Sequence, residues 1–154
     1  MRAKKPNLCN IQSLKKMKLL VTGSRTLTKG DGRLLLLGLA TVQEIAGRLP
    51  VLLLHGGAMG ADAQADAWAK AHGIPVEVVR PDYGAHGTKA APLLRNLVLV
   101  ERADWVLGVY APGRDRKGGT WYTVQAAVNL RRPVVEVLAD GRIEITMPAP
   151  TLFG

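Results

Sequence analysis

Three short segments combine glycine with small or polar residues, and each directly follows an apolar stretch. They are residues 22–25 (TGSR), residues 55–62 (HGGAMGAD) and residues 118–120 (GGT). Glycine allows a backbone to approach a ligand closely, and the free N–H groups at the start of a helix favour an anion. Binding of a phosphate group is the chemistry that these residue types and positions support.

Charged and polar side chains accompany the three segments. Arg25 can form a two-pronged hydrogen bond to phosphate. Asp62 can accept hydrogen bonds from ribose hydroxyls, or it can stabilise the start of a helix, and the sequence leaves both readings open. Thr120 is a plausible helix cap whose hydroxyl can instead meet a phosphate. Arg95 and Asn96 form a fourth element, after the loop PDYGAHGTKAAP.

Other polar and aromatic residues are expected to be structural. His55 at a strand end suits a hydrogen-bonded structural residue better than a catalytic base. The spacing of His55, His72 and His86 matches no metal site, so no metal is expected. In the basic loop at residues 114–117, Arg114 and Arg116 are each expected to be mobile and solvated, although the loop as a whole is able to close over a phosphate.

The elements that must position these residues alternate along the chain. Short apolar runs predict strands near 19–21, 51–54, 76–79, 105–110 and 134–137, and longer amphipathic stretches predict helices over 32–49, 60–72, 92–103 and 119–131. This rhythm indicates an α/β fold, a Rossmann-like doubly wound parallel sheet of about five strands in the order 3-2-1-4-5 with helices on both faces. Residues after Glu136 can add a short edge hairpin.

That topology brings the three segments together. Loops between strands and helices leave a parallel sheet at its carboxyl edge, and strands one and four flank the switch point. The TGSR and GGT segments should therefore face one crevice, with HGGAMGAD beside them.

Composition limits the other possibilities. The chain has 154 residues and a formal charge of +9; residues 1–18 hold six of its 21 basic residues and no acidic one, leaving 15 basic against 12 acidic residues in the remainder. We expect residues 1–16 to be a disordered basic leader, 17–147 a single domain and 148–154 a loose tail. Cys9 is the only cysteine, which excludes an intrachain disulfide, and no apolar run approaches a membrane span. A soluble cytoplasmic protein is expected.

The motifs TGSR, HGGAMGAD, PDYGAHGTKAAPLLRN and GGT, in this order between Met17 and Val137, resemble the DUF2493 or YspA-like group of the SLOG superfamily, relatives of the LOG and DprA Rossmann-like proteins. The resemblance implies binding of a nucleotide or a nucleotide-derived ligand such as an ADP-ribose-like signal, and a homodimer. Matched by position, the expected ligand-binding residues, with Gly118 added from the third segment, are Gly23, Ser24, Arg25, Gly56, Gly57, Gly60, Asp62, Arg95, Asn96, Gly118, Gly119 and Thr120.

The leading hypothesis is a sensor or sequestering module for a phosphorylated nucleoside, with no cofactor of its own. The first alternative is a LOG-like hydrolase that removes the base from a nucleoside 5′-monophosphate. That family uses a glutamate in a PGGxGTxxE motif, and Thr123 stands at this position, so the catalytic residue is not identified. The second alternative is DprA-like DNA binding, suggested by the sequence pI of about 10.1 and by the kinship to DprA.

Overall fold

Six strands form one sheet in this computed structural model, which describes residues 16–150. Their order is β3-β2-β1-β4-β5-β6, with β1 to β5 parallel and β6 antiparallel to β5. The strands are β1 (Lys18–Gly23), β2 (Leu52–His55), β3 (Val76–Val78), β4 (Trp105–Val109), β5 (Val134–Val137) and β6 (Ile143–Thr146). The helices are η1 (Lys29–Asp31), α2 (Gly32–Ala46), α3 (Ala61–Ala71), α4 (Tyr83–Arg102) and α5 (Gly118–Asn129).

The predicted α/β fold class and the strand order 3-2-1-4-5 are confirmed. The sixth strand is the edge hairpin expected after Glu136, and it turns at Gly141, whose φ of 90° suits a residue without a side chain. Since β6 runs against β5, the sheet is mixed rather than wholly parallel.

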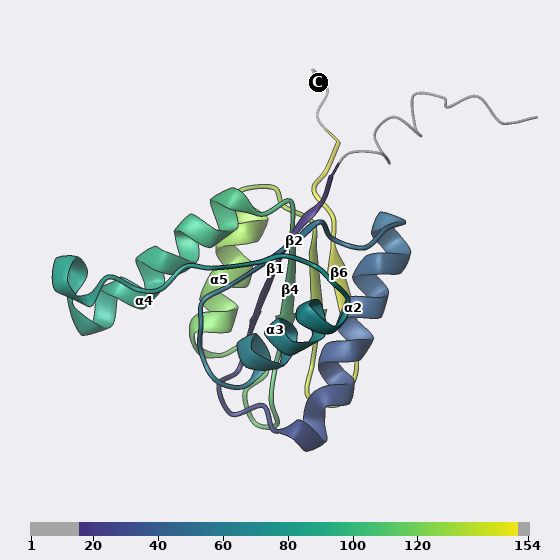
Figure 1. The fold of residues 1–154 in the computed structure, drawn as a ribbon, viewed down its shortest axis with the longest axis horizontal. Helices are drawn as coiled ribbons and strands as arrows, with labels where there is room; N and C mark the ends of the chain where they lie inside the picture. The colour runs from purple at the N-terminus through teal and green to yellow at the C-terminus, as the bar shows by residue number, and fades with distance from the viewer. Residues whose placement is uncertain (1–15, 151–154) are drawn as a thin grey trace, which may run out of the picture.

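Apolar side chains of alternating strand positions build a core on each face of the sheet. Leu19 and Val21 face the side covered by α2 and α3, whereas Leu20 between them faces the side covered by α4 and α5. Figure 1 shows these two helical layers around the strands. Both faces of β1 are therefore buried, as the continuous apolar run LLV requires.

Helix α4 is longer than the sequence predicted. A helix was expected only over 92–103, because Gly84, Gly87 and Pro92 all disfavour helix. The observed helix begins at Tyr83 and contains a break at Gly87, with φ 78° and ψ 178°. Pro92 lies in the second turn after this break, where its missing N–H leaves out one hydrogen bond of the helix. The first part of α4 projects from the body of the molecule (Figure 1).

Several expectations concern residues that the structure does not describe. The predicted leader at 1–16, with Cys9, lies outside the described residues except for Lys16, and so does the tail at 148–154 beyond Pro150. Within residues 16–150, no helix combines the length and apolar character needed to cross a membrane.

Candidate functional site

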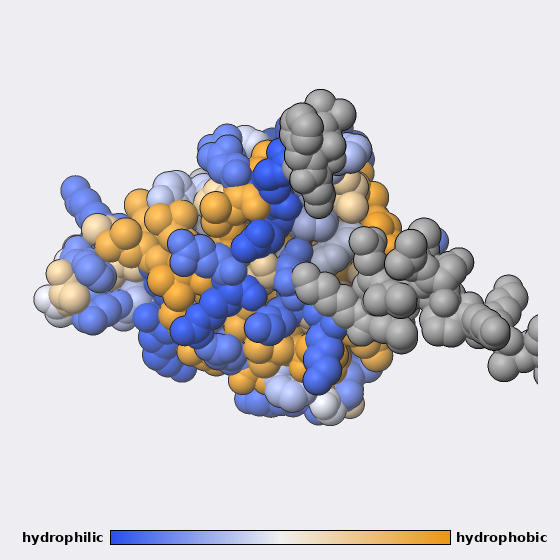
Figure 2. Space-filling view, turned by 90° about the horizontal axis from the view of Figure 1, so that it is seen from above, coloured by the Kyte–Doolittle hydropathy of each residue, from blue (hydrophilic) through white to orange (hydrophobic). Residues whose placement is uncertain are grey.

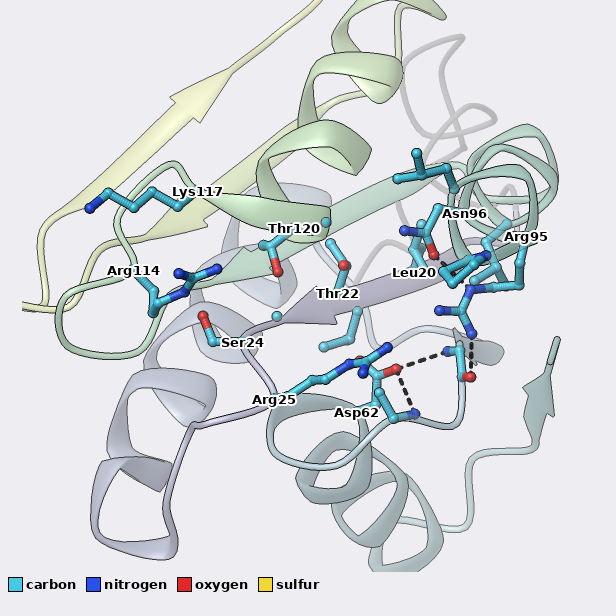
Figure 3. A pocket seen from close by; sticks show the side chains of 18 of the residues that line it. Leu20, Thr22, Ser24, Arg25, Asp62, Arg95, Asn96, Arg114, Lys117 and Thr120 are labelled. Carbon is cyan, nitrogen blue, oxygen red and sulfur yellow. Dashed lines mark hydrogen bonds between the residues drawn. The ribbon is translucent and has the colours of Figure 1, made fainter. Parts of the chain in front are cut away.

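A cavity of about 600 Å³ opens at the carboxyl edge of the sheet, where the loops after β1, β2 and β4 meet the inner side of α4. The expected residues that line it are Gly23, Ser24, Arg25, Gly56, Asp62, Arg95, Asn96, Gly119 and Thr120, and the expected residues that do not are Gly57, Gly60 and Gly118. The structure thus brings all three glycine-containing segments to one place, as the topology predicted. Figure 3 shows the side chains that surround the cavity.

The loop after β1 is fixed against β4. The Ser24 amide donates to the Val109 carbonyl at 3.0 Å, and the Ser24 hydroxyl oxygen accepts from the Ala111 amide at 3.0 Å. A Cβ on Gly23 would lie 2.4 Å from the Ala61 Cβ, so this position has no room for a side chain. The backbone is therefore rigid up to Ser24, while Arg25, whose side chain has no hydrogen bond or ion pair within the described residues, extends into the cavity (Figure 3).

The loop after β2 uses its amides internally. The Asp62 Oδ2 atom accepts from the amides of Gly56 at 3.0 Å and Ala58 at 3.2 Å, and the Gly57 amide donates to the His55 Nδ1 at 2.9 Å. We expected this backbone to curl around an anion. Instead, the carboxylate of Asp62 already occupies the place of one, so this loop shapes the cavity but offers few free N–H groups to a ligand.

Asp62 and Arg95 form the charged floor of the site. Burial raises the pKa of Asp62, against the opposing effects of the Ala58 amide, His55, the Gly56 amide and Arg95. Burial likewise lowers the pKa of Arg95, and the charge of Asp62 partly restores it. Each charge is thus costly to bury, and each is stabilised by the other and by backbone groups.

Arg95 is committed mainly to structure. Its guanidinium donates to the Gly56 carbonyl, to the Val79 carbonyl at 3.3 Å and, through Nε, to the Asn96 side-chain oxygen at 2.7 Å. A Cβ on Gly56 would overlap this guanidinium, which explains a glycine there. Arg95 therefore ties α4 to the loop after β2 and orients Asn96, whose amide nitrogen remains available to a ligand.

Helix α5 begins one residue earlier than predicted, with consequences for the third segment. Its N-cap is Lys117, and no side chain caps its first turn. Thr120 is therefore not the cap; it lies inside the first turn, buried, and lines the cavity. The uncapped amides at the start of α5 carry the partial positive charge that attracts an anion.

Arg114 lies over the start of α5 and is exposed, as expected of a solvated side chain. A Cβ on Gly118 would lie 2.8 Å from the Arg114 Nη2, so Gly118 makes room for this guanidinium even though it does not line the cavity. In Figure 3, Arg114 reaches toward Ser24 and Thr120, whereas Arg25 extends toward Asp62 on the opposite side of the cavity.

The remaining residues of this loop anchor it on the other side. Arg116 forms an ion pair with Glu144 and lies 3.6 Å from the buried Glu136, and its guanidinium is 5.4 Å from the centre of the Trp121 ring. The Asp115 Oδ1 accepts from the Ala139 amide at 2.8 Å. Arg116 is therefore a structural residue, and the loop that carries Arg114 is held in place.

Two further cations line the cavity and were not among the expected site residues. Lys117 belongs to the basic loop, and Lys89 lies in the part of α4 that was expected to be a loop. His55 has the structural role expected for it, since its Nε2 is 2.7 Å from the Asp66 carboxylate and its Nδ1 accepts from Gly57. Among residues 16–150, no group of three or more acidic, histidine or cysteine side chains is placed to hold a metal.

Two of three comparisons with known proteins found a match. The solved structure of the structural-genomics target TM1055 superimposes with a TM-score of 0.53 and 23% sequence identity, covering 77% of this chain and 72% of that one, which supports the fold. A comparison with curated proteins gave no match. The family model that matches spans residues 17–86, which include the first two glycine-containing segments but not the third. Over these residues, the chain is similar to the YspA, cpYpsA-related SLOG family.

Proposed function

We propose that the cavity binds a phosphorylated nucleoside, or a ligand derived from one, and that the protein is a sensor or sequestering module for it. The observation that carries the proposal is the charge of the lining, which contains five cationic side chains, Arg25, Lys89, Arg95, Arg114 and Lys117, and one carboxylate, Asp62. A cavity of about 600 Å³ is within the usual range for small-ligand sites. The similarity of residues 17–86 to the SLOG family supports the same ligand class.

The two ends of the cavity suit the two ends of such a ligand. Arg114, the uncapped start of α5 and the Thr120 side chain lie at one end, where they favour a phosphate. Leu20, Leu93 and Leu99 line the part toward α4, together with the Asn96 amide. We therefore place the phosphate at α5 and the base against α4, where Asn96 is able to hydrogen-bond an edge of the base.

Hydrolysis of the ligand is a second candidate, and Asp62 is the observation that bears on it. It is the carboxylate in the cavity lining, and burial raises its pKa, as suits a general acid. Its Oδ2 atom is already occupied by two backbone amides, however. Thr123, at the position of the LOG glutamate, is buried and donates its hydroxyl to the Gly119 carbonyl at 2.8 Å. These contacts favour binding without turnover.

The test is a thermal-shift panel of nucleoside mono-, di- and triphosphates, ADP-ribose, NAD and cyclic nucleotides. A ligand at 100 times its dissociation constant stabilises the fold by about 2.7 kcal/mol, which raises the melting temperature of a chain this long by roughly 5–10 °C. Arg114→Ala should remove a charged hydrogen bond worth about 1.5–3 kcal/mol and weaken binding roughly 10- to 100-fold.

Arg33→Ala is the matched control, because Arg33 is an exposed arginine that does not line the cavity. Equal weakening by both variants, or no shift with any member of the panel, would contradict the proposal. Each ligand that binds is then incubated and analysed chromatographically; release of free base would support the hydrolase instead. The homodimer stays a prediction, which the molar mass of the protein, measured by size-exclusion chromatography with light scattering, would test.

A further inference from the structure

A second cationic depression, which we call the amino-edge groove, lies at the opposite edge of the sheet. It has a volume of about 450 Å³, and its lining includes Lys16, Arg48, Arg131 and Arg132, together with Trp105 and Asp104. It is formed where β1 and β4 begin and where α2 and α5 end. We propose that this groove binds the phosphodiester backbone of a single-stranded nucleic acid.

The charges in the groove are poorly compensated. Lys16, Arg131 and Arg132 take part in no ion pair within residues 16–150. The one carboxylate, that of Asp104, accepts a hydrogen bond from the Lys18 amide at 2.9 Å, so part of its capacity is used by the backbone. Four cations against one carboxylate make this groove an anion-binding surface.

Arg131 and Arg132 close the end of helix α5 beside the groove. Arg131, with a φ of 60°, donates its amide to the Val128 carbonyl and Arg132 to the Ala127 carbonyl, which is the usual hydrogen-bond pattern of a helix end. The guanidinium of Arg132 donates to the carbonyls of Leu130 and Glu101, both at 3.2 Å, and its buried Nε has no partner in the described structure. This Nε is therefore an unused hydrogen-bond donor in the wall of the groove.

An extended polyanion fits these charges better than a small phosphate does. Lys16, Arg48, Arg131 and Arg132 all lie along this one groove rather than around a single point. Repeated cations suit the repeated phosphates of a nucleic acid.

Trp105 favours a single strand over a duplex. It lies in the groove only partly buried, and an indole face is a platform on which an unpaired base stacks. Figure 2 views this edge of the molecule and shows hydrophilic side chains across its middle with hydrophobic ones among them. Guanidinium groups beside an aromatic ring are the combination that single-strand binding sites use.

This site is independent of the proposed function. The six residues of β1 run from the groove to the nucleotide cavity, and a strand of that length spans about 20 Å. A nucleotide bound at the carboxyl edge should therefore not compete with a strand bound at the amino edge, and failure of one proposal leaves the other standing.

The test is fluorescence anisotropy of the full chain with a labelled oligothymidylate of about 20 nucleotides, from 50 to 200 mM salt. The variant Lys16→Gln with Arg131→Gln removes two exposed cations of the groove. For a single strand the salt slope changes by about 0.7 for each phosphate contact, so this variant should lose about 1.4 from the slope and bind roughly 20-fold more weakly at 0.1 M salt.

The matched control is Lys29→Gln with Arg33→Gln, which removes the same charge from exposed positions at the other edge. It should leave the slope nearly unchanged. Equal losses in the two double variants would overturn the proposal, as would no binding at 50 mM salt. Equally tight binding of a duplex, or competition by polyglutamate as strong as by unlabelled oligothymidylate, would also overturn the assignment to single-stranded nucleic acid.

Discussion

Replacing Asp62 tests whether its carboxylate holds the loop after β2 in shape. In Asp62→Ala the amides of Gly56 and Ala58 lose their acceptor. An unsatisfied buried N–H costs about 1–3 kcal/mol, and the Ala58 amide is the less buried of the two, so the loss should be about 3 kcal/mol in total. This is a large part of the stability of a typical domain, about 5–15 kcal/mol, but it leaves the chain folded.

Asp62→Asn is the matched variant. Both amides donate to the same oxygen, Oδ2, so the amide oxygen of asparagine is able to accept both hydrogen bonds. The substitution also removes a charge that burial disfavours, although Arg95 then loses a counter-charge. Asp62→Asn should therefore lose less than half as much stability as Asp62→Ala.

Urea unfolding at pH 7, followed by circular dichroism, measures both variants. With a denaturant slope of about 2 kcal/mol/M, a loss of 3 kcal/mol lowers the midpoint by about 1.5 M. An alanine variant within 0.5 kcal/mol of the natural protein would refute this account of the loop. An asparagine variant as unstable as the alanine variant would show that the charge, rather than the two hydrogen bonds, is what stabilises it.

Three other substitutions test the surroundings of the cavity. Gly60→Ala places a Cβ 2.4 Å from the Ser24 carbonyl oxygen at a φ of 73°, so its free energy of unfolding in urea should fall by roughly 3 kcal/mol or more. Gly47→Ala is the control, because its φ is 74° but no atom lies within 4 Å of the added Cβ; it should lose only about 1 kcal/mol. Tyr110→Phe removes the hydroxyl that donates to the buried Glu136 at 2.8 Å and should lower stability by about 2 kcal/mol, while Tyr122→Phe on the surface should change little. Asp66→Asn concerns pH: a hydrogen bond from Lys70, then one from His55, lowers the pKa of Asp66 in the folded state. The ionised Asp66 should therefore stabilise the fold by about 1 kcal/mol above its unfolded pKa near 4, and this stabilisation should be lost as the pH falls through the folded pKa. The urea unfolding curves of Asp66→Asn and of the natural chain should then converge in acid. A difference in midpoint that persists at pH 2 would contradict this role of Asp66.

The strands and their order could be predicted because their signals are local or follow general rules. Runs such as LLV and VVEV are too apolar for loops, and parallel connections of this length allow few topologies. The meeting of TGSR and GGT follows from that order alone, and Ser24, Gly119 and Thr120 do line the same cavity.

The details of the cavity depend on contacts that the sequence does not mark. Arg95 bonds to the carbonyl of Gly56, 39 residues away, and Asp62 folds back on the amides before it. Lys89 was missed because two glycines and a proline made its surroundings read as a loop. The anchoring of Arg116 by Glu144 depends on the exact turn into β6.

The central position of β1 has a consequence for how the protein folds. This strand is made near the start of the chain, yet its neighbour β4 pairs Trp105 with Leu19, 86 residues later. Until β4 has been synthesised, one edge of β1 has no partner, and the turn after Ser24 lacks the Val109 and Ala111 groups that fix it. Contacts of such long sequence separation form slowly. The cavity at the carboxyl edge is therefore a late product of folding, and shorter nascent chains carry its first two loops without the site.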